Sequence, residues 1–192
     1  ELHSSVEGLP SMYWCMGNHD FWNGRNYEET TRNLTAEQIV ELFNRSNGIE
    51  GDNTYYDLWI EGYHFILLSY EVGATRPSNE QINWLAEKLE ESAEEDKPIF
   101  IFLHQPFENT VAGSVPYDGF STYNPPASLE KILAAYPQAM LFTGHSHCDM
   151  NIPDSMLTPT DEHCYLFNCG AVIGASSNKY LDANGKKIKT MT

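Results

Sequence analysis

Polar side chains of the metal-binding types follow directly after three apolar segments of this sequence. The first segment ends in Gly-Asn-His-Asp, the second in a single histidine, and the third in Gly-His-Ser-His. Imidazole nitrogens combined with amide or carboxylate oxygens bind zinc, iron, manganese and similar ions. Because ligands bind at the carboxyl ends of strands in open α/β sheets, we expect these side chains to gather at one sheet edge. The candidates are Asn18, His19, Asp20, His104, His145 and His147.

His145 and His147 are the most informative pair among these candidates. Residues two apart in an extended chain share one face, so both imidazoles can bind one ion, or two ions roughly 3.5–4 Å apart. Gly144 would let the backbone approach closely at this point. Taken singly, the other candidates also have structural explanations, since His104 can be a hydrogen-bonded core histidine and Asn18 a turn residue. The four cysteines include no C-x-x-C pair, which favours reduced core thiols over a disulfide framework.

The elements that must position these residues are predicted from periodicity and turn residues. Residues 54–60 and 63–70 are rich in aromatic and β-branched types around Glu61-Gly62, which predicts an antiparallel hairpin. Capping boxes predict helices that begin after Thr35 and after Ser78, and apolar spacing predicts a further helix over 129–136. Short apolar runs predict strands at 12–16, 99–103 and 139–142, with further candidates at 164–168 and 171–173. The run at 99–103 is continuous enough for a central strand buried on both faces.

Two stretches lack this periodicity. Residues 107–124 are predicted to form a surface loop that could cover a site. Residues 179–192 form a Lys-rich tail, in which Asn184-Gly185 is a hairpin signal. Because we find no repeat and no linker, we expect residues 1–192 to form a single domain.

Composition limits the classes of partner. A chain of 192 residues with 41% hydrophobic residues can bury a core, which excludes a disordered chain. The formal net charge of −16 repels nucleic-acid backbones and anionic membranes, so we expect neither a long nucleic acid nor a membrane as partner. The sequence has no apolar run of membrane-spanning length. We expect a cytoplasmic location, with a secreted or surface-attached protein as the open alternative.

In their order, spacing and strand-end context, the motifs Gly17–Asp20, His104 and Gly144–His147 resemble the calcineurin-like metallophosphoesterases. The resemblance extends over about residues 12–174 and includes the Gln81-x-x-Trp84-Leu85 helix before the strand at 99–103. It implies the α/β fold class, as a four-layer α/β/β/α sandwich of two mixed sheets. It also implies an enzyme that hydrolyses a phosphoester, with a phosphorylated small molecule or a phosphodiester as substrate.

The resemblance implies a role for each candidate residue. Asn18, His104 and His145 would bind one metal ion, and His147 would bind a second. His19 would contact the phosphoryl group or protonate the leaving group, with Asp20 orienting its imidazole. The two ions, divalent or mixed-valence manganese, iron or zinc, would hold a bridging hydroxide that attacks phosphorus.

The sequence departs from the family pattern in its first part. The family has an Asp-x-His and a Gly-Asp motif upstream, and the 16 residues before Gly17 contain neither. We therefore expect a fragment truncated at its N-terminus, roughly the C-terminal two thirds of a longer phosphoesterase. In such a fragment one metal site is incomplete, the isolated chain is inactive or weakly active, and exposed sheet edges promote self-association. Gln105 stands where many relatives have a second histidine.

Two alternatives to an enzyme follow from these departures. The first is a catalytically degenerate member of the same fold that serves as a binding scaffold. The second is an unrelated α/β protein with scattered core histidines. That protein would place Asn18, His104 and His145 far apart.

Overall fold

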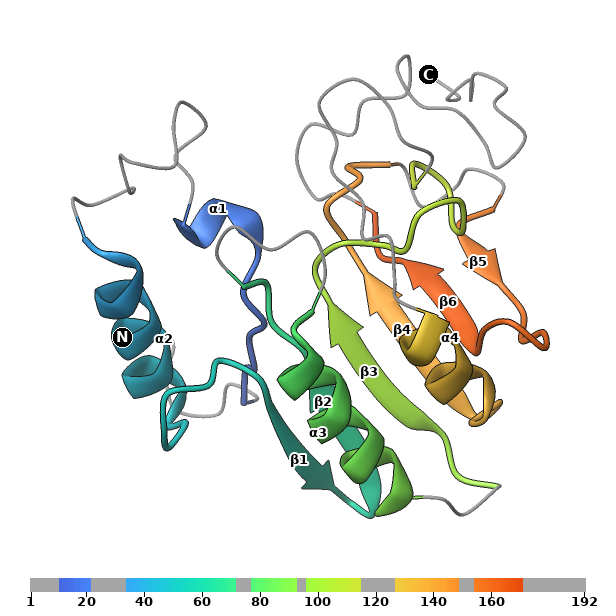
Figure 1. Cartoon of the computed structure of the whole chain (residues 1–192), viewed down its shortest axis with the longest axis horizontal. Coiled ribbons are helices and arrows are strands. Elements are labelled where there is room, and N and C mark those ends of the chain that lie inside the picture. The colour runs from blue at the N-terminus through green and yellow to red at the C-terminus, as the bar shows by residue number, and fades with distance from the viewer. Residues whose placement is uncertain are drawn as a thin grey trace.

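The computed structural model describes residues 11–21, 34–71, 77–92, 96–114, 127–148 and 154–170, which form a mixed sheet with helices (Figure 1). The helices are α1 Asn18–Phe21, α2 Ala36–Asn47, α3 Asn79–Glu90 and α4 Ala127–Ala134. The strands are β1 Tyr56–Ile60, β2 Tyr63–Leu67, β3 Ile99–Leu103, β4 Ala139–Thr143, β5 Met156–Leu157 and β6 Tyr165–Asn168. They are ordered β1-β2-β3-β4-β6-β5.

The four inner strands of this sheet run parallel. β2, β3, β4 and β6 pair in parallel, whereas β1 and β5 are antiparallel edge strands. Leu103 at the end of β3 lies beside Thr143 at the end of β4. The segments that follow these strands therefore emerge at the same edge of the sheet, the upper edge in Figure 1.

The two faces of the sheet have different cover. Ile99, Ile101 and Leu103 are buried in one cluster with apolar side chains of α3 and α4, the helices in front of the sheet in Figure 1. Phe100 and Phe102 alternate with them and are only half-buried. Phe100 stacks on Phe65 of β2 with a ring-centroid distance of 4.9 Å. The predicted central position of 99–103 is therefore confirmed, but its predicted burial on both faces is wrong, because the second face is a half-buried aromatic layer.

The predicted hairpin and helix starts are confirmed. The β1–β2 hairpin has its turn at Glu61 and Gly62, which have φ of 51° and 82°. At α2, Thr35 Oγ1 accepts the N–H of Gln38 at 3.3 Å, and Gln38 Oε1 accepts the N–H of Thr35 at 2.8 Å. These reciprocal bonds are the predicted capping box.

The second box is only half formed, because its glutamine binds elsewhere. Ser78 Oγ accepts the N–H of Gln81 at 3.2 Å, as the helix start requires. The fully buried Gln81 side chain instead accepts the N–H of Ser69 at 2.8 Å and donates to the Ser69 carbonyl at 3.3 Å. Gln81 thus joins α3 to the segment that follows β2.

The strand predicted at residues 12–16 is wrong. Met12, Tyr13 and Trp14 are 47–53% exposed, and no strand in the described part of the chain pairs with them. Met16 is buried, and its carbonyl accepts the N–H of Tyr70 at 3.2 Å. Without a neighbouring strand the segment remains irregular, although its last residues lie beside the chain that leaves β2.

Other predictions are confirmed in part. β3, β4 and β6 lie at the predicted strands, α4 matches the helix predicted over 129–136, and the two-residue β5 was not predicted.

Residues 107–114 are not a surface loop as expected, since Phe107, Val111 and Ala112 are buried. The described residues form one sheet, so the four-layer arrangement stays a prediction. Residues 115–124, 171–173 and 179–192 lie outside the described residues, including the tail and its hairpin signal.

Replacing Gln81 by leucine should destabilise the fold by about 1–3 kcal/mol, because two buried backbone groups of Ser69 would lose their partners. Urea unfolding followed by circular dichroism measures this change. Asn83→Leu, at an exposed position of the same helix, is the control and should change stability little. Equal stability of the two variants would contradict the anchoring role of Gln81.

Candidate metal centre

Three of the predicted metal ligands meet at the upper edge of the sheet. Asn18 begins α1, His104 follows β3, and His145 follows β4. Asn18 Oδ1 lies 2.8 Å from His104 Nε2 and 3.2 Å from His145 Nδ1, and the two nitrogens are 3.2 Å apart. His104 and His145 are 86 and 127 residues from Asn18 in the sequence, yet donor atoms of the three side chains form one triangle.

This triangle fits a transition-metal ion. Donors that bind one ion at about 2.0–2.1 Å are roughly 3.0–3.4 Å apart, which is close to the separations found here. One amide oxygen and two imidazoles form a donor set suited to zinc, iron or manganese. Burial raises the pKa of the thiols of Cys15 and Cys164 to about 11 and about 12, so these thiols stay protonated. The four cysteines are free.

Gly17 makes room for the His104 ring. A Cβ at Gly17 would lie 2.8 Å from both Cε1 and Nδ1 of that imidazole, closer than side chains approach each other. A Cβ at Gly144 would meet only the His104 carbonyl, at 3.8 Å. The close approach expected at Gly144 is therefore found at Gly17, while Gly144 contributes a backbone bond from its N–H to the His104 carbonyl at 2.9 Å.

The surroundings of His104 keep its imidazole neutral. Burial, together with the nearby His19 and His147, lowers the pKa of His104 from 6.5 to about 4, and burial is the largest of these causes. The rings of His104 and His145 meet edge to face, with centroids 5.0 Å apart. Since only a neutral imidazole offers a lone pair to a metal, His104 is in the binding form near neutral pH.

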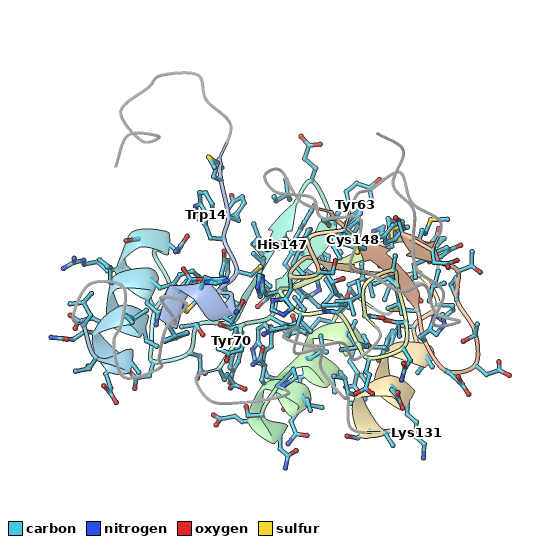
Figure 2. The ribbon with its side chains drawn as sticks, turned by 90° about the horizontal axis from the view of Figure 1, so that it is seen from above. Trp14, Tyr63, Tyr70, Lys131, His147 and Cys148 are labelled. Atoms are coloured by element: carbon cyan, nitrogen blue, oxygen red, sulfur yellow. The ribbon has the colours of Figure 1, made fainter. Side chains whose placement is uncertain are left out.

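The segment that carries His145 and His147 does not have the expected extended backbone. Both residues have left-handed φ, 61° and 53°, and the N–H of Ser146 donates to the Gly144 carbonyl at 2.6 Å. The two histidines therefore do not share a face in the way that an extended strand would place them. His147 is exposed, and Figure 2 shows it near the centre of the molecule seen from above. Its binding to a second ion stays a prediction.

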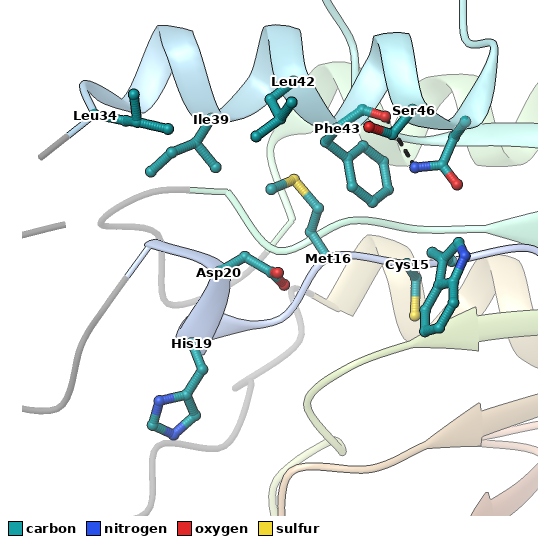
Figure 3. Close-up of a pocket in the computed structure, with 11 residues that line it drawn as sticks. Cys15, Met16, His19, Asp20, Leu34, Ile39, Leu42, Phe43 and Ser46 are labelled. Atoms are coloured by element: carbon teal, nitrogen blue, oxygen red, sulfur yellow. Dashed lines mark hydrogen bonds between the residues drawn. The ribbon is translucent and has the colours of Figure 1, made fainter. Parts of the chain in front are cut away.

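His19 and Asp20 lie beside a cavity. The cavity has a volume of about 590 Å³ and lies between α2 and residues 14–20, with apolar walls from Ile39, Leu42 and Phe43 (Figure 3). Asp20 Oδ2 accepts the N–H of Gly17 at 2.7 Å, which closes the turn before α1. Figure 3 shows the His19 and Asp20 side chains leaving α1 in different directions. The orienting role of Asp20 thus stays a prediction.

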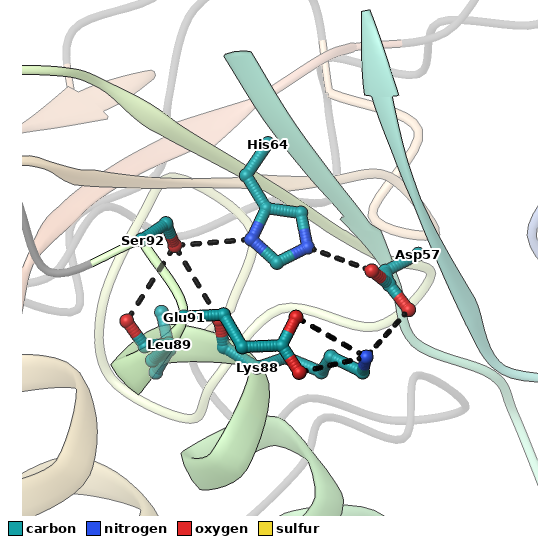
Figure 4. A network of polar contacts seen from close by, with 6 residues as sticks. All are labelled: Asp57, His64, Lys88, Leu89, Glu91 and Ser92. Atoms are coloured by element: carbon teal, nitrogen blue, oxygen red, sulfur yellow. Dashed lines mark hydrogen bonds and ion pairs between the residues drawn. The ribbon is translucent and has the colours of Figure 1, made fainter. Parts of the chain in front are cut away.

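A second polar cluster, drawn in Figure 4, lies at the opposite end of the sheet, where His64 pairs with Ile99, and was not predicted from the sequence. Donor atoms of Asp57, His64 and Glu91 lie within 4.8 Å of one another, close enough to hold an ion. His64 bonds Asp57 Oδ2 at 2.9 Å and Ser92 Oγ at 3.0 Å. Lys88 Nζ lies 3.0 Å from Glu91 and 3.3 Å from Asp57, so an ammonium group already supplies positive charge between the carboxylates.

No sequence signal marked this second cluster. Its residues are scattered over β1, β2 and the end of α3, and Glu91 belongs to a glutamate-rich helix flank that reads as solvated surface. His64 pairs with Ile99 at the start of β3, whereas His104 follows the end of that strand. The two clusters are therefore separated by the length of β3.

The chain is similar to proteins of a known family, which indicates the chemistry of this site. The model of the calcineurin-like phosphoesterase family matches residues 3–149. The chain belongs to this family. The resemblance drawn from the motifs is thus confirmed, and the alternative of an unrelated α/β protein is wrong. Membership of this family supports metal-dependent phosphoester hydrolysis in general.

A solved structure is also similar to this phosphoesterase-family chain. It is the crystal structure of a dimetal phosphatase from Danio rerio, with 15% sequence identity and a TM-score of 0.47. The similarity covers 67% of this chain and 53% of the other, so the chain spans about half the length of that protein. No curated protein matches the sequence. Among the described residues, no helix is both long and apolar enough to cross a bilayer.

Gly17→Ala should displace the His104 ring and weaken metal binding by about tenfold or more, as loss of ligand orientation does elsewhere. Isothermal titration of the metal-free protein with Co²⁺ measures the affinity. Gly144→Ala, whose added methyl meets only an ordinary contact, is the matched control and should bind Co²⁺ as the wild type does. An unchanged affinity in Gly17→Ala would contradict this packing argument.

The lowered pKa of His104 predicts acid sensitivity of the metal-free protein. Between pH 6.5 and about pH 4 the unfolded chain takes up a proton at this position that the folded chain does not. Stability should therefore fall as pH decreases through this range, and this contribution should be constant below it. Urea unfolding with a chelator present, compared between wild type and His104→Gln, measures the difference. Identical pH slopes in both proteins would contradict the assignment.

Proposed function

We propose that this chain forms part of a phosphoester hydrolase in which Asn18, His104 and His145 hold one metal ion. The observation that supports this is the triangle of their donor atoms, with sides of 2.8, 3.2 and 3.2 Å. Membership of the calcineurin-like phosphoesterase family supports the same chemistry. Divalent ions bound there would neutralise the charge of the phosphoryl group and lower the pKa of a water molecule.

The remaining candidates act around this centre. His147 would hold a second ion; its charge lowers the pKa of His104, which supports a position near the first ion. The charge of His19 also lowers the pKa of His104, and the His19 side chain is exposed at the start of α1. Its imidazole would contact phosphoryl oxygens or give a proton to the leaving oxygen. Asp20 would hold the turn that presents His19, through its bond to Gly17.

The substrate is proposed to be a small phosphoester, either a monoester or a diester. The cavity of about 590 Å³ beside His19 has the volume of a small-molecule site. The net charge of −16 opposes the approach of long nucleic acids. The donor set admits manganese, iron or zinc without choosing among them.

Turnover of p-nitrophenyl phosphate and its bis ester with added Mn²⁺ tests this proposal. Asn18→Ala and His104→Ala should lose most of the rate, and His19→Ala should lose about a hundredfold or more if it acts as an acid. His163→Ala is the matched control, since His163 precedes β6 at its amino end and bonds the Cys164 carbonyl at 2.8 Å. It should keep the wild-type rate.

Turnover at the wild-type rate in Asn18→Ala and His104→Ala would contradict the proposal. Fewer than one bound ion per chain at saturating Mn²⁺ or Zn²⁺, together with no turnover, would instead favour a binding scaffold that keeps the fold without the chemistry. Metal analysis by mass spectrometry after gel filtration distinguishes these outcomes.

A further inference from the structure

Asn168 is a buried polar residue that the proposed mechanism does not use. It ends β6, beside the end of β4, and is 4% exposed. Its Nδ2 donates to Ser146 Oγ and to the Ala112 carbonyl, both at 2.8 Å, and its Oδ1 accepts the N–H of Gly170 at 2.9 Å. The side-chain amide therefore both donates and accepts, and its bonds join the end of β6 to two segments distant in sequence, at Ala112 and Ser146.

Ser146, the partner of Asn168, lies between the two histidines of the Gly-His-Ser-His motif. Its neighbours His145 and His147 both adopt left-handed backbone. Residues with a Cβ are rarely found in this conformation, which persists only where surrounding contacts impose it. Ser146 is 1% exposed, and its Oγ also accepts the N–H of Cys148 at 3.4 Å. The serine side chain is thus the buried anchor of the segment.

The segment at 111–114 packs closely against the same anchor. Gly113 has φ of 79°, and a Cβ there would lie 2.9 Å from Ser146 Cβ and 2.5 Å from Cys148 Sγ. The neighbouring Ala112 carbonyl is held by Asn168. Ser146 is therefore enclosed between this segment and the end of β6, while the adjacent His145 reaches Asn18 and His104.

We propose that Asn168 is a positioning residue for the metal centre: it holds Ser146, and thereby sets where His145 Nδ1 lies relative to Asn18 and His104. This rests on the proposed function, in which those three side chains bind an ion. Partners that orient a metal ligand change metal affinity by about 10- to 100-fold when they are removed. Asn168 has this effect through Ser146 and the backbone, without touching the ion.

The test compares Asn168→Leu with Asn44→Leu. Asn44 is a matched control, because it is 5% exposed and donates to the Gly51 carbonyl at 2.9 Å, in α2 away from the donor triangle. Both variants should lose thermal stability. Only Asn168→Leu should lower Co²⁺ affinity, by about tenfold or more in isothermal titration. Equal affinities in the two variants, within twofold, would overturn the proposal.

Ser146→Ala tests the same coupling with a smaller change. It removes only a hydroxyl group and should fold even if Asn168→Leu does not. It should also weaken Co²⁺ binding, and the double variant should lose less affinity than the two single losses combined, because both act through one bond. Full additivity, or wild-type affinity in Ser146→Ala, would contradict the coupling.

A measurement without metal separates this proposal from the proposed function. In the metal-free protein, nuclear Overhauser contacts between the rings of His104 and His145 report their relative position. The ring centroids are 5.0 Å apart. These contacts should weaken in Ser146→Ala and Asn168→Leu and persist in Asn44→Leu. Unchanged contacts in all variants would overturn the positioning role. Failure of the wild type to bind Co²⁺, with the contacts altered as expected, would count against the proposed function alone.

Discussion

The parallel pairing of β3 with β4 is the constraint on which the candidate centre depends. Leu103 and Thr143 lie side by side, so both strands end at the same level. The next residues are tied by the bond from the Gly144 N–H to the His104 carbonyl. A register shift of one residue would turn alternate side chains to the other face. The in-register ends therefore bring His104 and His145 together before any ion contributes.

Burial gives the centre its chemical character. Removing His104 from water favours its neutral form, which leaves a lone pair beside those of Asn18 and His145. Three lone-pair donors at such distances repel one another unless protons or a cation lie between them. Because burial keeps the His104 ring unprotonated, no proton competes with a metal ion for its lone pair. Packing against Gly17 holds the ring in position.

The polar cluster at the other end of β3 provides a contrast. There, Lys88 lies between the carboxylates of Asp57 and Glu91, and His64 is bonded on both ring nitrogens. The negative carboxylates of this cluster are thus paired with a positive group of the same chain. Such a network links the hairpin to the end of the helix. At the upper edge, by contrast, the converging groups are amide and imidazole.

The sequence by itself determined the local features: the turn at Glu61-Gly62, the start of α2 at Thr35, the strand at 99–103, and the motifs that identify the family. These depend on residue types within a few positions of each other. Only the tertiary structure decided the left-handed backbone around Ser146, the anchoring by Asn168, the contact of Gly17 with His104, and the irregular course of residues 12–16. Each of these features depends on segments that are distant in the sequence. The first three arise from contacts between such segments, and the irregular course of residues 12–16 arises because no strand pairs with the segment, although its residue types favour a strand.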